Sequence, residues 1–333
     1  MKKMLFVYNP MAGKEQISTH LSNIVQVFCK ASFEVTIFAT AGPKDATRIV
    51  EERGTEYDYI VCSGGDGTMN EVATGLMSLE QKPVCGYIPA GTVNDFASSL
   101  SIPKVMEEAA SLVVNGEVFH CDLGQFNEKY FTYVAAFGAF TEVSYQTPQE
   151  LKNALGKTAY FVEALKHIAE IKVHHMKIIY DQGVIEDDFL LGLISNSESV
   201  AGFKAYQNRD IKMDDGLLEA LFIRKIKNPV ELQLVINSLL TKNLDSEQLL
   251  TISSSHFHIV SDDNIQWTLD GEDGGYFDEV DLRCHKRVLP IICEPAAVAR
   301  HINTILMSYE NSHSCVPLFN HIFIIMCCIV EVV

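Results

Sequence analysis

Apolar and amphipathic stretches alternate along the first 115 residues of this 333-residue chain. Short apolar runs, each typical of a buried strand, lie at residues 4–8, 33–38, 57–62 and 84–88. Between them, apolar positions recur with the period of a helix at residues 15–31, 44–53 and 70–78. This alternation predicts a parallel sheet with helices on both faces. Because ligands bind such sheets at the carboxyl ends of the strands, we expect the chemistry in the loops there.

From residue 117 onward, short runs alternate apolar and polar residues and are separated by turn residues. They lie at residues 118–126, 130–137, 176–180, 189–195, 217–223, 256–260, 265–269 and 279–284. This pattern predicts an antiparallel β-sandwich. Helical patterns interrupt it at residues 149–172 and 229–240, and a closing helix is predicted at 295–307. We therefore expect an α/β protein with an N-terminal three-layer α/β domain (1–116 and 288–309), a C-terminal β-sandwich domain (117–287) and a tail (310–333).

Composition excludes some functions. A formal net charge of −17 argues against a nucleic-acid partner, because neutralising phosphates requires clustered Lys and Arg. The nine cysteines are scattered and contain no CxxC pair, which is typical of reduced thiols in a cytosolic protein. The N-terminus lacks the pattern of a signal peptide. The apolar run at residues 322–330 is about half as long as a membrane-spanning helix, which favours a packed end over a membrane-associating tail.

Two glycine-containing turns follow the first and third predicted strands. The first reads Asn9-Pro10-Met11-Ala12-Gly13-Lys14, and the second reads Ser63-Gly64-Gly65-Asp66-Gly67-Thr68-Met69-Asn70-Glu71. Small residues let backbone N–H groups approach a phosphate at the start of the following helix. Asp66 could reach Mg²⁺ directly or through water, because Mg²⁺ prefers carboxylate oxygen. The alternatives are a plain turn for the first motif and a helix N-cap for Asp66.

A third turn follows the fourth predicted strand, and a fourth turn lies far along the chain. They read Pro89-Ala90-Gly91-Thr92-Val93-Asn94-Asp95-Phe96 and Leu269-Asp270-Gly271-Glu272-Asp273-Gly274-Gly275. In the third turn, Gly91 and Thr92 suit phosphate approach and Asp95 adds a carboxylate, while Asn94 or Asp95 can also cap a helix. In the fourth turn, a carboxylate at a strand end suits a general base, although the residues alone favour an acidic hairpin turn.

Together with Asp214-Asp215-Gly216-Leu217-Leu218, these four turns resemble the motifs of the diacylglycerol kinase catalytic domain family, which includes sphingosine and ceramide kinases. The resemblance spans residues 4–307 and is greatest to the soluble diacylglycerol kinases of Gram-positive bacteria. It implies that the α/β domain is nucleotide-binding, with Mg²⁺ and ATP as cofactors.

The resemblance also implies roles for individual residues. Asp270 would act as the general base, with Glu272 as the alternative in the same loop, and Asp66 and Asp95 would hold the catalytic Mg²⁺. A second, structural Mg²⁺ would be held by Asp215 and the backbone carbonyls of Lys212 and Leu217. ATP would contact the residues Asn9, Pro10, Met11, Ala12, Gly13, Thr40, Gly64, Gly65, Asp66, Gly67, Thr68, Met69, Asn70, Glu71, Gly91, Thr92 and Asn94.

The implied activity is transfer of the γ-phosphate of Mg·ATP to the hydroxyl of diacylglycerol, which gives phosphatidic acid. Such an enzyme would be cytoplasmic and peripherally associated with the inner face of the membrane, and its relatives suggest a homodimer. The amphiphilic segment 156–175 is the candidate for membrane contact, with a core-packed helix that has a solvated basic face as the alternative. Other acceptors left open are a sphingoid base, a prenol and a glycolipid. An NAD kinase-like or phosphofructokinase-like enzyme, or a binding regulator without turnover, is also left open.

Overall fold

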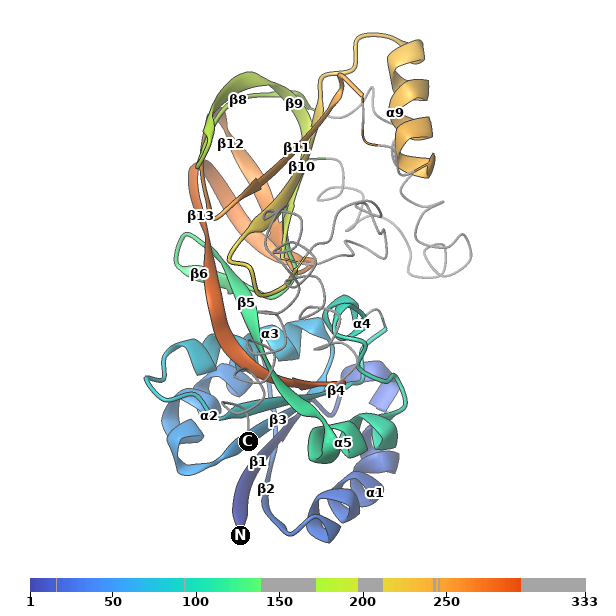
Figure 1. Ribbon diagram of the computed structural model, residues 1–333, viewed down its shortest axis with the longest axis vertical. Helices are drawn as coiled ribbons and strands as arrows, with labels where there is room; N and C mark the ends of the chain where they lie inside the picture. Colours follow the sequence, from blue (N-terminus) through green and yellow to red (C-terminus); the bar gives the residue numbers. More distant parts are fainter. Residues whose placement is uncertain are drawn as a thin grey trace, which may run out of the picture. The chain divides into compact units, whose positions relative to one another are not determined.

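The computed structural model describes residues 1–15, 17–92, 94–138, 172–196, 212–241, 244 and 246–294 (Figure 1). The predicted helix at 295–307, the tail and most of the segment at 149–172 lie outside these residues. Residues 172–175 of the membrane-contact candidate are described. His174 and His175 begin a β-strand, whereas the alternative interpretation made this segment a helix.

The N-terminal half has the alternating architecture that the apolar pattern predicts. Its strands are β1 (Lys2–Tyr8), β2 (Phe33–Ala39), β3 (Tyr59–Gly64) and β4 (Val84–Pro89). Its helices are α1 (Ile17–Lys30), α2 (Asp45–Arg53), α3 (Asp66–Met77), α4 (Asp95–Ser99) and α5 (Met106–Asn115), with 3-10 turns η1 (Ala12–Glu15) and η2 (Gly54–Glu56). The strands pair in parallel in the order β4-β3-β1-β2. Helices α2 and α3 lie together on one side of this sheet, and α1 and α5 lie together on the other (Figure 1).

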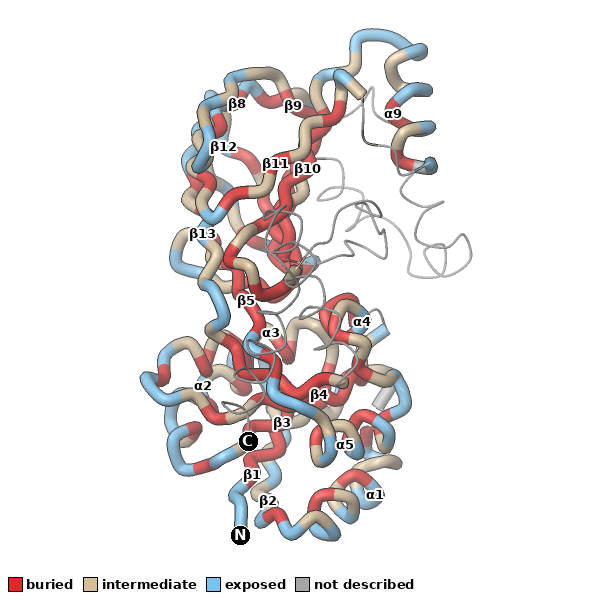
Figure 2. The backbone as a smooth tube through the Cα atoms, in the orientation of Figure 1, coloured by how far each residue is buried: buried red, intermediate tan, exposed pale blue. Residues whose placement is uncertain are grey.

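Burial explains this layering. Four consecutive residues of β1, from Met4 to Val7, are fully buried, as in a strand covered on both faces. Helix α1 buries Ile17, Ile24 and Phe28, which recur at helical spacing on one stripe. Figure 2 shows the same contrast, with largely buried strands and helices that alternate between buried and exposed residues. The parallel sheet therefore forms the middle layer.

The described residues of the C-terminal half form antiparallel strands and one helix. They are β5 (Glu117–Phe126), β6 (Lys129–Phe131), β7 (Val134–Gly138), β8 (His174–Tyr180), β9 (Gly183–Ser195), β10 (Leu218–Arg224), α9 (Pro229–Thr241), β11 (Leu249–Ser254), β12 (His256–Leu269) and β13 (Glu272–Cys293). Both β7 and β8 pair with β9 on one side and β12 on the other, so they occupy successive parts of one position in the sheet. The core contains packed aromatic rings, with Trp267 in tilted contact with Phe126 and in edge-to-face contact with Phe137.

The two halves share one hydrogen-bonded sheet, because β13 belongs to both. Along most of its length β13 pairs antiparallel with β12 and β5, and at its end Ile291 pairs in parallel with Cys85 of β4. Residues Met1–Pro295 form one compact unit. The expected fold class, an α/β region followed by a largely antiparallel β region, is confirmed.

Several local expectations were wrong. Helix α3 begins at Asp66, four residues before the predicted start, because the glycines before it allow the turn into the helix. The predicted strand at 130–137 is two strands, β6 and β7, separated at Thr132 and Tyr133. The runs at 256–260 and 265–269 form the single strand β12. Helix α5 and strand β11 were not predicted.

Candidate active site

Three glycine turns meet at the carboxyl edge of the parallel sheet. The N–H of Asn9 donates to the carbonyl of Ser63 (2.9 Å), and the N–H of Ala90 donates to that of Gly64 (2.8 Å). A Cβ on Gly13, which has φ +55°, would stand 2.0 Å from the carbonyl oxygen of Ala90. A Cβ on Gly91 would stand 2.7 Å from the Cα of Gly65. Glycine is therefore required at Gly13 and Gly91, and the turns form one surface of exposed backbone that suits a phosphate chain.

The N-terminus of α3 points into this edge. Gly65 is its N-cap in an extended conformation, and no side chain caps the helix. The leading N–H groups of a twelve-residue helix therefore remain for an anion. Met69 lies outside that ligand set, because its side chain is fully buried and its N–H donates to the carbonyl of Gly65 (3.1 Å). Thr68 accepts a hydrogen bond from the Asn9 amide (3.4 Å), which links the first two turns.

The third turn is locked by its asparagine. The Asn94 side chain accepts from the N–H of Gly91 (3.0 Å) and donates to its carbonyl (2.7 Å), and Tyr87 donates to the same amide oxygen (3.3 Å). Asn94 adopts the left-handed conformation with φ 54° and makes no capping bond to α4. Its side chain therefore shapes the turn rather than capping the helix.

Asp66 and Asp95 come together below these turns. The Asp66 carboxylate accepts from the N–H groups of Asp95 (3.3 Å) and Phe96 (3.4 Å) at the start of α4. Burial, followed by the negative charges of Asp95 and Asp270, raises the pKa of Asp66 to about 6. Asp95 is only 2% exposed. The site thus concentrates carboxylate charge, which a bound cation would relieve.

The two residues after the second turn have roles that the motif alone did not indicate. Asn70 donates to the Asp270 carboxylate (2.8 Å) and to the carbonyl of Tyr130 (2.9 Å), so it connects α3 to the antiparallel region. Both oxygens of Glu71 accept backbone N–H groups at the start of α2, from Lys44 (2.7 Å) and Ala46 (3.1 Å). Glu71 therefore fixes the loop that follows Thr40.

Asp270 is enclosed by hydrogen-bond donors. Its Oδ1 accepts from the N–H groups of Tyr133 (3.0 Å) and Val134 (3.0 Å). Its Oδ2 accepts from the N–H of Thr132 (2.7 Å), the hydroxyl of Thr132 (2.8 Å) and the amide of Asn70. A carboxylate has about four lone-pair sites, so five donors leave no free position for a substrate proton. Burial raises the pKa of Asp270, while its backbone donors act in the opposite direction.

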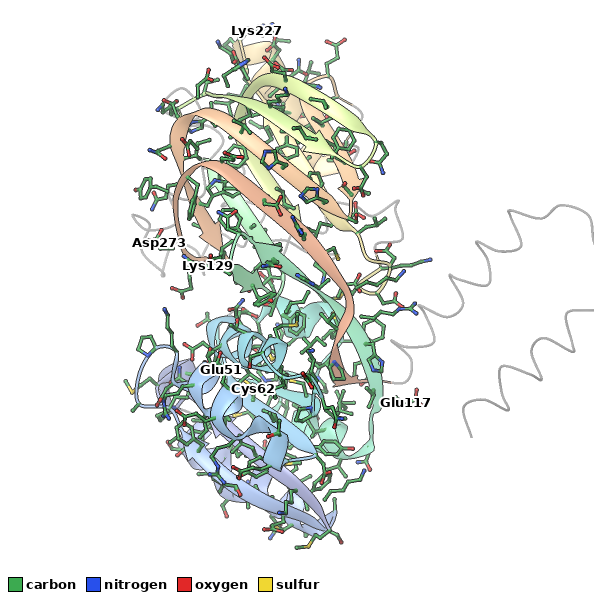
Figure 3. All side chains as sticks on the ribbon, turned by 90° about the vertical axis from the view of Figure 1, so that its left-hand side faces the viewer. Glu51, Cys62, Glu117, Lys129, Lys227 and Asp273 are labelled. Atoms are coloured by element: carbon green, nitrogen blue, oxygen red, sulfur yellow. The ribbon has the colours of Figure 1, made fainter. Side chains whose placement is uncertain are left out.

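Glu272 differs from Asp270 in its exposure and in its contacts. It is exposed, and its Oε1 lies 3.9 Å from the point where a Cβ of Gly67 would stand, beside the first turn of α3. Asp270 adopts φ +51° and Gly271 φ +85°, so the chain turns sharply between the buried and the exposed carboxylate. Lys129 donates to the carbonyl of Gly274 (2.8 Å) and ties β6 to this turn, where Figure 3 labels Lys129 beside Asp273.

Comparison with known proteins decides the family. The sequence model of the "Diacylglycerol kinase catalytic domain" matches residues 3–126. The chain is 32% identical over 277 residues to the diacylglycerol kinase of Bacillus subtilis (strain 168), which covers 83% of this chain and 91% of that protein. The chain belongs to the diacylglycerol kinase family. It is also 33% identical over 276 residues to the enzyme of Staphylococcus aureus (strain MRSA252), covering 82% and 87% of the two chains.

The solved structure of a diacylglycerol kinase from Bacillus anthracis str. Sterne has the same architecture. Its TM-score is 0.75 at 28% identity, and the match covers 89% of this chain and 98% of that one. The protein is therefore a lipid kinase of this family, whose members use ATP. Within the described residues, no helix is both long and apolar enough to cross a membrane.

A second acidic cluster lies around Asp122, a residue that was not predicted from the sequence. Asp122 is fully buried and accepts the N–H groups of Gly216 (2.6 Å) and Arg287 (2.6 Å). Arg287 also pairs with Asp214 (2.8 Å). Among the described residues, Asp215 accepts only the N–H of Leu217 (3.0 Å), and partial burial raises its pKa. The signal for Asp122 was a single acidic residue inside an apolar strand.

Among the residues that the structure describes, no three His, Cys, Asp or Glu side chains converge as a preassembled metal site. Asp66 and Asp95 are brought together on the α3–α4 side, and Asp270 is close enough to raise the pKa of Asp66. In the second cluster, the N–H of Leu217 donates to the carboxylate of Asp215. Lys212 forms no hydrogen bond with any other residue that the structure describes.

The Glu71 contacts give a first testable prediction. Replacing Glu71 by Gln turns one acceptor oxygen into a donor that faces a backbone N–H of α2. We expect the free energy of unfolding to fall by about 1–2 kcal/mol. Urea denaturation of the variant would measure this, with Glu51→Gln on the exposed side of α2 as the matched control. Equal stability of the two variants would contradict the capping role.

Proposed function

We propose that this protein is an ATP-dependent diacylglycerol kinase that transfers the γ-phosphate of Mg·ATP to the hydroxyl of diacylglycerol and yields phosphatidic acid. One observation supports this best. An exposed carboxylate, Glu272, lies beside the first turn of α3, at the edge of the sheet where the glycine turns suit a phosphate chain. The relatives named diacylglycerol kinase support the acceptor.

In this proposal Glu272 is the general base and Asp270 organises the turn that presents it. The lone pairs of Asp270 are occupied by five donors, whereas Glu272 is exposed. Glu272 accepts the proton of the acceptor hydroxyl while the hydroxyl oxygen forms a bond to the γ-phosphorus of ATP. The bond from that phosphorus to the oxygen that bridges it to the β-phosphorus breaks, and ADP leaves. The glycine turns and the α3 N-terminus bind the phosphate oxygens through backbone N–H groups.

Asp66 and Asp95 would hold Mg²⁺, which neutralises charge on the phosphate chain when it is bound. Their fit to a cation comes from the burial of Asp66 and its repulsion by Asp95 and Asp270, which together raise the pKa of Asp66. We also propose a structural Mg²⁺ at Asp215 and the carbonyls of Lys212 and Leu217, because the Asp215 carboxylate is partly buried and accepts one hydrogen bond from the described residues.

A pH-dependence of stability follows from Asp66. Its pKa is 3.8 ordinarily and about 6 in the folded protein, so the folded state binds more protons between these values. The free energy of unfolding therefore falls as pH rises from 4 to 6, by at most about 3 kcal/mol, and stays lower above pH 6. Urea denaturation in EDTA should show Asp66→Asn to be more stable than wild type at pH 7.5 but not at pH 4, whereas Asp278→Asn on the exposed part of β13 should match wild type. A stability gain of Asp66→Asn at both pH values would contradict this assignment.

Lipid access requires contact with a membrane, so we propose peripheral association with the inner face of the cytoplasmic membrane. A homodimer is also proposed, and sedimentation of the purified protein tests it.

The function is tested by incubating the protein with ATP, Mg²⁺ and diacylglycerol in mixed micelles and identifying the lipid product. Phosphorylation of a sphingoid base, a prenol, a glycolipid or NAD instead would refute the diacylglycerol assignment. ATP binding with no phosphorylated product would indicate a regulator.

A further inference from the structure

Tyr133 lies beside the turn that carries the proposed base, although no motif pointed to it. Its N–H donates to Asp270 Oδ1 (3.0 Å), and its carbonyl accepts the N–H of Asn196 (3.1 Å), so its backbone is held on both sides. The side chain is 8% exposed. Its hydroxyl lies 3.7 Å from the point where a Cβ of Gly271 would stand. Gly271 is the residue between Asp270 and Glu272, so the phenol lies beside the turn that presents the proposed base.

The Tyr133 hydroxyl is a hydrogen-bond donor close to several carboxylates. It forms no hydrogen bond within the part of the chain that the structure describes. The nearby hydroxyl of Tyr87, by contrast, donates to the carbonyl of Gly64 and the Asn94 amide (both 3.3 Å). Burial and the charges of Asp270 and Asp66 raise the pKa of Tyr133 well above its usual value. The phenol therefore stays protonated and can donate at any working pH.

The acceptor classes left open differ in what they offer such a donor. A diacylglycerol has, beside its reacting hydroxyl, an ester carbonyl on the neighbouring carbon, and that carbonyl can only accept a hydrogen bond. A sphingoid base offers an ammonium and a second hydroxyl at this distance, and a prenol offers only hydrocarbon. A donor that a bound ligand closes off from water without offering it an acceptor is costly, so a ligand that supplies an acceptor is favoured.

We propose that the Tyr133 hydroxyl donates a hydrogen bond to the ester carbonyl next to the phosphorylated hydroxyl, and that this contact selects glycerol esters as acceptors. Tyr133 is then a specificity-determining residue on the acceptor side of the site. The proposal rests on the proposed lipid kinase function and names the chemical group by which its acceptor is recognised.

The test compares 1,2-diacylglycerol with its 1,2-dialkyl ether analogue, which keeps the hydroxyl and the chains but lacks the carbonyl. Both are assayed in mixed micelles with wild type and Tyr133→Phe. Wild type should favour the ester in kcat/KM by roughly 3- to 10-fold, the range of one neutral hydrogen bond. Tyr133→Phe should lose that factor for the ester and none for the ether, with an unchanged melting temperature because the ring still fills its space.

Tyr276→Phe is the matched control, because Tyr276 is 61% exposed on β13. It should leave both rates unchanged. If Tyr133→Phe lowered kcat/KM equally for the ester and the ether, the proposal would be overturned. Equal losses would mean that the hydroxyl acts on the nucleotide or the base and not on the ester carbonyl. An unchanged ester preference in the variant would overturn it as well. If wild type phosphorylates neither lipid, the proposed function falls together with this inference, whereas activity without ester preference overturns this inference alone.

Discussion

Glu272→Gln is expected to lower kcat by about 10²–10⁴-fold, the usual contribution of a general base, while the melting temperature stays that of wild type. The reason is geometric. Glu272 is exposed at the start of β13 and faces the first turn of α3, so its carboxylate is available to a substrate proton. A glutamine keeps the shape but cannot accept that proton.

Single-turnover phosphorylation of diacylglycerol by Glu272→Gln would measure this, with Asp273→Asn as the matched control. Asp273 is the exposed neighbour of Glu272, and its carboxylate accepts only the N–H of Gly275 (3.2 Å). We expect this control to retain activity within a few fold. Near-normal kcat in Glu272→Gln would refute its assignment as the base and return that role to Asp270.

Asp270→Asn is expected to reduce the free energy of unfolding by roughly 2–5 kcal/mol, because the new amide group directs a donor at N–H groups that are themselves donors. The carboxylate holds the backbone of Thr132, Tyr133 and Val134 and is only 7% exposed, so water cannot replace the lost acceptor. Activity should fall too, since the turn that presents Glu272 loses its anchor.

Chemical denaturation of Asp270→Asn, read beside its activity, separates the two possible roles of this residue. The partial control is Asn70→Ala, which removes one of the five donors and leaves the backbone bonds in place. It should cost about 1 kcal/mol, less than Asp270→Asn does. A variant at Asp270 that is as stable as wild type yet inactive would instead indicate that Asp270 is the base.

The motif residues illustrate how far sequence reasoning reached. The glycine turns were located correctly from their residue types at the ends of apolar strands. The close backbone approach that requires glycine at Gly13 and Gly91 involves Ala90 and Gly65 of other turns, and only the structure shows it. The roles of Asn70 and Glu71 could not be predicted from their place beside the same turn. Asn70 bonds to a residue 200 positions away, and Glu71 to backbone 25 and 27 positions away. Neighbouring positions on a helix point to different sides, so adjacency in a motif does not imply a shared ligand.

The strand predicted at 130–137 shows a second limit. Its alternation of apolar residues continues through Thr132 and Tyr133, yet the ladder breaks there because their N–H groups turn to Asp270. A carboxylate 138 positions away thus overrides the local strand pattern. The predicted return of the chain to the α/β domain at residue 288 falls inside β13, which pairs with β5 and then, at Ile291, with β4.

The sequence by itself determined the alternation of strands and helices, the glycine turns, the family and the set of candidate carboxylates. These follow from periodicity and turn chemistry, which act over a few residues. Only the tertiary structure decided which carboxylate is free. Asp270 and Glu272 are two residues apart and chemically alike. The register of β12 against β7 places four donors from Thr132, Tyr133 and Val134 around Asp270, and α3 adds a fifth, whereas Glu272 is left exposed beside Gly67. Such pairing depends on contacts between distant segments, and no local pattern encodes it.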